Sequence, residues 1–159
     1  MKTLNDIFEH TLQDVYYAEN AILKALPKVI EEAGNAGLKE ALKEHLSETK
    51  TQVATLKKVF KSIGAEAKGV KCDAIDGLIK ECEGVMDEAK GAAARNAGII
   101  GCCQAIEHYE IARYGTLREW AKALGHEDAH QMLGSILDQE KAADHKLTGL
   151  AVESVNKAA

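Results

Sequence analysis

Acidic residues occupy several positions of this sequence where a helix would place apolar side chains. An α-helix turns about 100° per residue, so the direction of each side chain follows from its position. Glu19 lies in the middle of one apolar stripe. Glu107 and Glu110 lie within about 30° of the centre of another stripe. Glu140 is central in a third, with Asp144 one turn further on towards its edge.

The residues between these stretches add one more helix with polar residues on its inner side. His45, Thr49 and Gln52 replace apolar residues in its stripe. Glu48 lies about 80° from the centre of this stripe, at its margin. Four successive helices therefore bring acids, or an acid and a histidine, to one bundle interior.

Metal binding is the chemistry that this pattern favours, because a glutamate is almost never fully buried without a partner. No lysine lies near a stripe centre, and Arg118 is eight residues from Glu110, about 12 Å along the axis. Protonation of several neighbouring glutamates would need large pKa shifts. Two divalent cations would balance the acids, and the shortage of inward histidines favours iron or manganese over zinc or copper.

Each of these residues also has an ordinary structural interpretation. A single glutamate on a stripe can snorkel to solvent, and a single inward histidine such as His45 can be a core or interface residue. Cys103 and Tyr114 are interpreted as packing. Tyr16, one turn before Glu19, either packs or hydrogen-bonds a ligand. Acids on four successive long helices are harder to explain in this way, which favours the metal site.

Glycines and one capping pattern predict the helices that position these residues. Thr3 followed by Asp6 predicts a helix start, and Gly64 and Gly125 predict helix ends. Pro27 predicts a kink or break, and interruptions are expected near Gly91 and Gly98. The predicted helices are Leu4–Ala33, Leu38–Ile63, Asp73–Lys90, a long helix ending at Leu124, and His126–Lys157.

This order predicts an all-α, ferritin-like up-down four-helix bundle. Two long helices form a hairpin, a long connection with a short extra helix crosses over, and two more long helices follow. The length of 159 residues and the lack of a linker predict a single domain over residues 1–159.

Composition excludes several other classes of function. The net charge of −5 is spread along the chain without a basic cluster, so nucleic acid is not an expected partner. No stretch approaches the roughly 18 apolar residues of a membrane helix, and no signal peptide is visible. The cysteines form no CxxC pair, which favours reduced thiols in the cytoplasm over zinc or disulfides. They are Cys72, Cys82, Cys102 and Cys103.

Four segments around the acids resemble the YciF/YciE family of bacterial ferritin-like stress proteins. The segments are DVYYAEN around Glu19, HLSET around Glu48, IEHYEIARYGTL around Glu107 and Glu110, and QEKAADHKLTGLA around Glu140. The resemblance runs from Leu4 to about Asn156. It implies a ferritin-like bundle that forms a homodimer, with a di-metal-type site and a link to bacterial stress responses.

The general ferritin-like pattern has one Glu on each of two helices and Glu-x-x-His on the other two. Glu19 and Glu107 match the first kind. Thr51 and Ala143 stand where the two histidines would be. The predicted metal ligands, including the substitutes that lie nearby, are Glu19, His45, Glu48, Glu107, Glu110, Glu140 and Asp144.

Three functions are open at this point. The first is a redox-active protein with two iron or manganese ions, iron favoured, in which Glu48 and Glu140 bridge the ions and peroxide or dioxygen is the small oxidant. The second is a non-enzymatic dimeric stress protein, or a metal sequesterer with a degenerate site, which the missing histidines favour. The third is a thiol sensor that uses Cys102 and Cys103.

Overall fold

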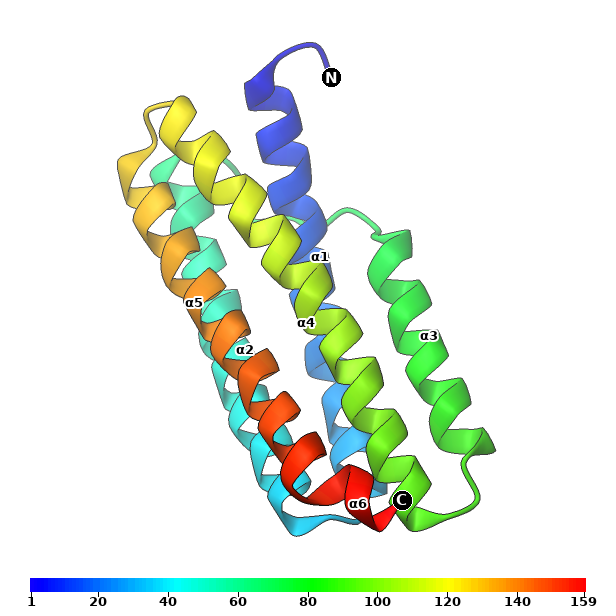
Figure 1. The fold of residues 1–159 in the computed structure, drawn as a ribbon. Coiled ribbons are helices and arrows are strands. Elements are labelled where there is room, and N and C mark those ends of the chain that lie inside the picture. The colour runs from blue at the N-terminus through cyan, green and yellow to red at the C-terminus, as the bar shows by residue number, and fades with distance from the viewer.

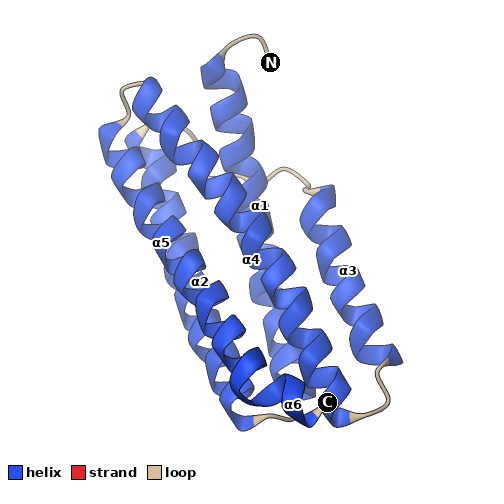
Figure 2. Cartoon of the chain, viewed as in Figure 1, coloured by secondary structure: helices blue, strands red, loops and turns tan.

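The chain folds almost entirely into helices, and the computed structural model describes residues 1–159. Short loops join most of the helices, and only the connection between α2 and α3 is extended (Figure 2). The elements are α1 (Leu4–Glu32), α2 (Ala36–Ser62), α3 (Asp73–Glu88), α4 (Ala92–Ala123), α5 (Glu127–Leu150), a π-helical turn (Ala151–Val155) and α6 (Asn156–Ala158).

Four of the helices close into a bundle. Helix α1 packs against α2 and α4, and α5 packs against α2 and α4. Helices α1 and α2 form one antiparallel hairpin, and α4 and α5 form the other (Figure 1). Helix α3 lies alongside α1 and α4 and returns the chain, so that α4 begins at the same end of the bundle as α2. The predicted all-α four-helix bundle with a crossover connection and a short extra helix is confirmed.

The predicted helix boundaries follow from local chemistry. The Thr3 hydroxyl accepts a hydrogen bond from the backbone N–H of Asp6, whose carboxylate accepts one from the N–H of Thr3. This reciprocal cap satisfies donors that the first helical turn would leave free. Gly64 and Gly125 follow α2 and α4 with φ of 71° and 77°, a conformation that glycine adopts without steric cost.

The expected break at Pro27 is absent, because α1 continues through it to Glu32. The Pro27 ring is exposed, while Leu26 and Val29 beside it are buried in the core. Proline costs the helix one backbone hydrogen bond. Burial of the flanking apolar side chains stabilises the last turn enough to keep it helical.

The interruption near Gly91 is present, but the one near Gly98 is not. Residues Ala89–Gly91 separate α3 from α4, and α4 then runs unbroken through Gly98. A Cβ at Gly98 would lie 2.5 Å from Cγ1 of Val85. This glycine therefore allows α3 to approach α4 closely and does not end a helix. At the other end of the chain, the last helix changes to a π-helical turn at Ala151 before the predicted end at Lys157.

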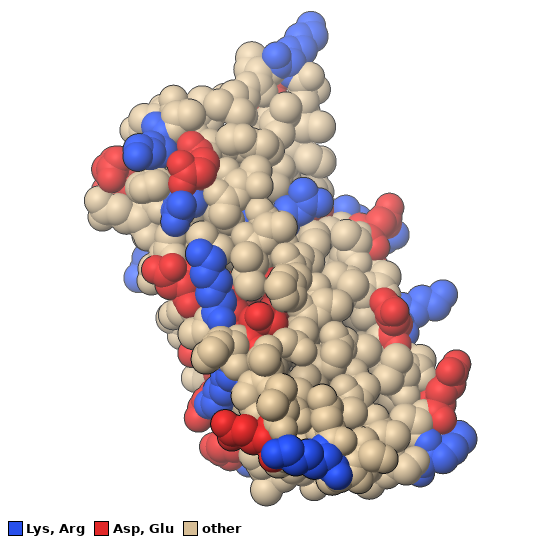
Figure 3. Space-filling view, viewed as in Figure 1, with Lys and Arg blue, Asp and Glu red and all other residues tan.

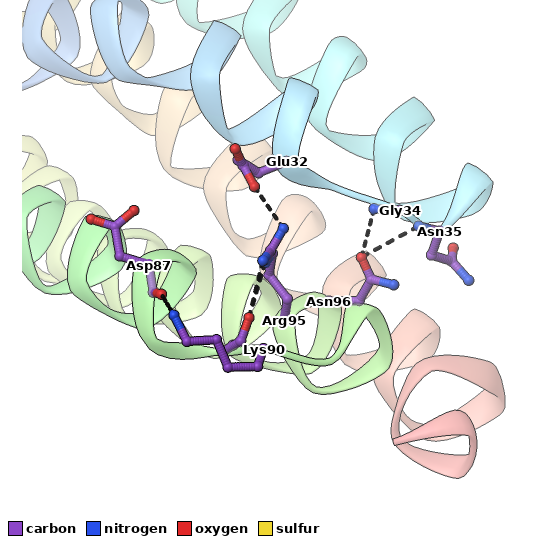
Figure 4. A network of polar contacts seen from close by, with 8 residues as sticks. Glu32, Gly34, Asn35, Asp87, Lys90, Arg95 and Asn96 are labelled. Carbon is purple, nitrogen blue, oxygen red and sulfur yellow. Dashed lines mark hydrogen bonds and ion pairs between the residues drawn. The ribbon is translucent and has the colours of Figure 1, made fainter.

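Polar contacts fix the end of the bundle where the two hairpins meet (Figure 4). The Asn96 side chain on α4 accepts hydrogen bonds from the backbone N–H of Gly34, at 2.8 Å, and of Asn35, at 3.3 Å. The Arg95 guanidinium lies 2.8 Å from the Glu32 carboxylate at the end of α1. These contacts hold the start of α4 against the turn between α1 and α2.

The apolar core is divided into two clusters with a polar layer between them. On α1, Val15 belongs to one cluster and Ile22 to the other, and Glu19 lies between. The same division occurs on α4, where Cys103 and Tyr114 belong to different clusters. Every bundle helix thus crosses from one apolar cluster to the other through a polar stretch, and these stretches meet in one layer.

Charged side chains of both signs are interspersed on the outer surface. On the face shown in Figure 3, lysines and arginines lie next to aspartates and glutamates. None of the helices is long and apolar enough to cross a membrane.

Candidate metal centre

Four glutamates and one histidine meet in the polar layer between the two apolar clusters. Glu19 comes from α1, Glu107 and Glu110 from α4, and Glu140 from α5. Their exposed fractions are only 0–2%. His45 on α2, with 9% exposed, is the fifth buried member. The spacing of three between Glu107 and Glu110 places both on the inner face of α4, as the sequence predicted.

These side chains form two groups whose potential ligand atoms lie within 4.8 Å of one another. One group is His45, Glu107 and Glu110, and the other is Glu19, Glu110 and Glu140. Glu110 is common to both groups. Each of the two groups offers the ligand atoms that could hold a metal ion.

Hydrogen bonds from neighbouring side chains orient two of the acids. The Tyr114 hydroxyl on α4 donates a hydrogen bond to Oε1 of Glu19. The Gln52 side-chain amide on α2 donates to Oε1 of Glu140 at 2.6 Å. Sequence reasoning interpreted Tyr114 as packing alone and gave Gln52 no role at the site. The signal available for Tyr114 was its position one turn after Glu110, on the same face.

Several buried polar atoms in this layer have no hydrogen-bond partner within the chain. The unpartnered ligand atoms are Oε2 of Glu19, Nδ1 of His45, Oε2 of Glu107, Oε1 of Glu110 and Oε2 of Glu140. Native proteins rarely leave such atoms unpaired, since each costs about 1–3 kcal/mol or more. The Nε2 atom of His45 lies 3.5 Å from Oε1 of Glu107, and no lysine or arginine pairs with the four carboxylates.

Burial shifts the protonation of the whole layer. It raises the pKa of Glu19, Glu107, Glu110 and Glu140 above the ordinary value of 4.5, and repulsion between the carboxylates raises it further. Burial also lowers the pKa of His45 from 6.5 to about 4. The layer without a bound cation therefore favours neutral acids and a neutral imidazole.

The donor set fits divalent cations of hard character. Four carboxylates would cancel the charge of two such ions, and carboxylate oxygens with a single imidazole suit iron or manganese. The unpartnered oxygens and the His45 Nδ1 atom are the groups that coordination would satisfy. A cation would also replace the protons that burial otherwise imposes on the acids.

The other two predicted ligands lie at the edge of this layer and belong to neither group. Glu48 is exposed on α2 and lines a cavity that leads to Glu107. Asp144 is half-buried on α5, where its carboxylate accepts a hydrogen bond from the Gln104 amide at 3.0 Å and lies 3.5 Å from Nε2 of His108. Their roles as ligands, and the bridging roles of Glu48 and Glu140, stay predictions.

Of the two interpretations of Tyr16, the structure shows packing. Its ring meets the Phe60 ring edge-on, with the ring centroids 5.6 Å apart. Tyr16 therefore belongs to the apolar cluster on one side of the layer, whereas Tyr114 makes the hydrogen bond to the site.

The four cysteines are free thiols, and they differ in environment. Cys102 is half-buried and faces Cys82 on α3, which donates a hydrogen bond that lowers the pKa of the Cys102 thiol. Burial raises the pKa of Cys103 to about 12. The neighbouring Cys102 and Cys103 thus have opposite reactivities, which does not favour their action as a vicinal sensor pair.

Thiol labelling of the folded protein at neutral pH should therefore modify Cys102 first. The reactive species is the thiolate, and Cys102 is both the most exposed of the four and the one whose pKa is lowered. A Cys102→Ser variant should lose the fast phase of reaction with an aromatic disulfide reagent, followed by absorbance. A Cys103→Ser variant should keep it, and a fast phase that survives in Cys102→Ser would contradict the assignment.

Comparisons with known proteins place the chain among relatives of similar length. Residues 3–159 match a family model described as "Domain of unknown function (DUF892)". Protein YciF of Escherichia coli (strain K12) is 41% identical over 160 residues, which cover 100% of this chain and 96% of that protein.

Solved structures agree with this assignment. The crystal structure of the E. coli stress protein YciF matches with a TM-score of 0.94 and covers 99% of each chain. The structure of YcfI from Rhodopseudomonas palustris is 49% identical, with a TM-score of 0.91, and the match covers 92% of this chain and 94% of that one. The resemblance inferred from the segments around the acids is confirmed, and the chain belongs to the DUF892 family, which includes the stress protein YciF.

Proposed function

We propose that this protein binds two divalent metal ions, iron in preference to manganese, in its carboxylate layer and uses them to react with peroxide or dioxygen. One observation carries the proposal. Two ligand groups share Glu110, and their buried oxygens and the His45 Nδ1 atom have no partner within the chain. In a purely structural layer, nothing would compensate the free-energy cost of burying these unpartnered polar atoms.

Each ion would have a defined set of ligands. His45 and Glu107 would bind one ion, Glu19 and Glu140 the other, and Glu110 both. Bound iron supplies the electrons that reduction of peroxide or dioxygen requires. Glu48 and Asp144 would complete the coordination from the edge of the layer.

The surrounding residues prepare the site for this role. The Tyr114 hydroxyl and the Gln52 amide hold one oxygen each of Glu19 and Glu140, which leaves the second oxygen of each carboxylate for a ligand. The apolar clusters exclude water from the two sides of the layer that they cover. Such exclusion strengthens electrostatic interactions with a bound cation.

The cellular role that we propose is a bacterial stress response in the cytoplasm. The support is that E. coli YciF, 41% identical over the whole chain, is described as a stress protein. Free thiols at all four cysteines suit a reducing compartment. Association into a homodimer stays a prediction from the resemblance.

A second candidate is a non-enzymatic metal sequesterer or interaction protein with a degenerate site. It is favoured by Thr51 and Ala143, which stand where a ferritin-like site has histidines. The exposed position of Glu48 also favours a site with fewer ligands.

Elemental analysis of the protein purified without added metal or chelator tests the proposal. We expect about two iron or manganese ions per chain, and almost none in a Glu19→Ala/Glu140→Ala variant. The matched control is Glu31→Ala/Glu153→Ala, which removes two exposed acids and should keep the metal.

The outcomes separate the two candidates. Bound metal together with consumption of peroxide or dioxygen by the ferrous protein supports the redox function. Bound metal without such consumption favours the sequesterer. A wild-type protein that takes up neither ferrous nor manganous ion under anaerobic conditions rules out the metal centre.

A further inference from the structure

A cavity of about 150 Å³ opens between α2 and α5 and ends at the candidate metal centre. Its outer part is lined by exposed residues, including Glu44, Glu48 and Lys146. Its inner part is lined by the buried residues His45 and Glu107, together with the apolar core residues Leu42, Cys103 and Leu147. A water molecule needs only about 10–15 Å³ of such space, so the cavity has room for several waters or a partly hydrated ion.

We propose that this cavity is the route by which a divalent cation reaches the metal centre, and that Glu44 and Lys146 form its gate. The inference rests on the proposed function and specifies how that site is filled. It concerns residues that are not ligands of the ions, so it can fail while the metal centre stands.

The two site residues at the inner end of the cavity carry polar atoms that lack a partner. His45 and Glu107 are more than nine-tenths buried, yet Nδ1 of His45 and Oε2 of Glu107 have no hydrogen-bond partner. Both residues belong to one ligand group of the metal centre. A cation that passes along the cavity therefore arrives at one of the two proposed positions without crossing the apolar core.

At the outer end of the cavity, a lysine side chain already occupies the position beside a carboxylate. The Lys146 ammonium on α5 pairs with the Glu44 carboxylate on α2 across the mouth. These side chains are 48% and 54% exposed, and ion pairs of that exposure are weak and open readily. Glu48, one helical turn after Glu44 on the same face of α2, also lines the cavity.

Small side chains keep the path open on the α5 side. Ala142 and Ala143 line the cavity, and Ala143 lies three residues after Glu140. A larger residue at 143 would project into the space. By contrast, the apolar hollow that reaches Cys103 from α1 and α3 is lined by none of the four site glutamates.

The rate of metal uptake tests the route. Metal-free protein would be mixed rapidly with cobalt(II) at low ionic strength, and uptake followed by the visible absorption of the bound ion. We expect Glu44→Gln to slow uptake and Lys146→Gln to speed it, each by up to about fivefold, because one charge at the mouth is removed in either case. Ala143→Leu should slow uptake by at least about tenfold by filling the path.

Matched controls lie on surfaces outside the cavity. Lys28 on α1 and Glu83 on α3 form an ion pair of similar exposure, with 3.3 Å between Nζ and Oε1, and their Gln variants should take up cobalt at the wild-type rate. Ala21→Leu places the same enlargement at a half-buried alanine of α1 that lines a different hollow. The effects of Glu44→Gln and Lys146→Gln should also fade near 1 M salt, where charges are screened beyond about 3 Å.

Final metal content, measured by elemental analysis, distinguishes a failure of the uptake route from a failure of the metal centre. The route is supported if every variant reaches full metal occupancy, while uptake is slower in Glu44→Gln and faster in Lys146→Gln. Full occupancy with wild-type rates in Glu44→Gln and Ala143→Leu overturns the route and leaves the metal centre intact. If wild-type protein binds no cobalt(II), ferrous or manganous ion at all, both the route and the proposed function are overturned.

Discussion

Saturating ferrous or manganous ion should raise the midpoint of thermal unfolding of the metal-free protein by about 8–16 °C for each ion bound. This range applies at a free metal concentration near 1,000 times Kd. The ligands of the candidate centre come from α1, α2, α4 and α5, so they converge only in the folded chain. Metal that binds the folded state alone shifts the folding equilibrium towards it. Anaerobic calorimetry of chelator-treated protein, with and without metal, measures the gain.

The gain should fall by about half or more in Glu107→Ala and persist in Glu31→Ala. Glu107 provides an unpartnered buried oxygen to the first ligand group, whereas Glu31 is exposed on α1. If Glu107→Ala retains the full metal-dependent rise, Glu107 is not a ligand and the first ligand group is wrong.

Much of this arrangement could be predicted from the sequence because helical phase is a local property. The inward direction of Glu19, Glu140 and the Glu107/Glu110 pair follows from their spacing relative to apolar neighbours, and all four are buried. The marginal phase of Glu48 agrees with its exposed position. The long connection that contains α3 indicated the crossover, because a crossover can be predicted from the length and order of the segments alone.

The features that could not be predicted depend on contacts between helices. That Glu110 belongs to both ligand groups depends on how α1, α2 and α5 approach α4. The hydrogen bond from Tyr114 to Glu19 also joins two helices. Gly98 looked like a helix interruption because its close neighbour, Val85, lies on another helix. A residue's own phase does not reveal its partner across the bundle.

A Glu110→Gln substitution should stabilise the metal-free protein and abolish its stabilisation by metal. Glu110 is 2% exposed, its Oε1 atom has no partner, and three other acids surround it. Burial holds this acid protonated above its ordinary pKa, at a cost in stability that an amide of similar shape avoids, so the substitution should raise stability at pH 8 by about 1–3 kcal/mol, or roughly 3–10 °C in Tm. Loss of the shared ligand should remove the metal effect.

The sign of the pH dependence follows from the raised pKa of Glu110. Because burial raises its pKa above 4.5 in the folded state, the contribution of this group is fully present below that value and is lost as the pH rises through the folded pKa. Stability of the metal-free wild type should therefore decrease from about pH 5 to pH 8 through this group. The lowered pKa of His45 acts in the opposite direction, but it is common to both proteins and cancels in the comparison.

Thermal unfolding of the metal-free wild type and Glu110→Gln from pH 5 to pH 8 measures this difference. It should be small at pH 5 and grow towards pH 8, while Glu31→Gln follows the wild type throughout. A structural carboxylate would behave differently, because its replacement would destabilise the protein with and without metal. The Glu110 carboxyl lowers the stability of the metal-free protein. This is expected of a ligand whose charge is balanced only when a cation is bound. A Glu110→Gln variant that is less stable than the wild type at pH 8 without metal would contradict this account.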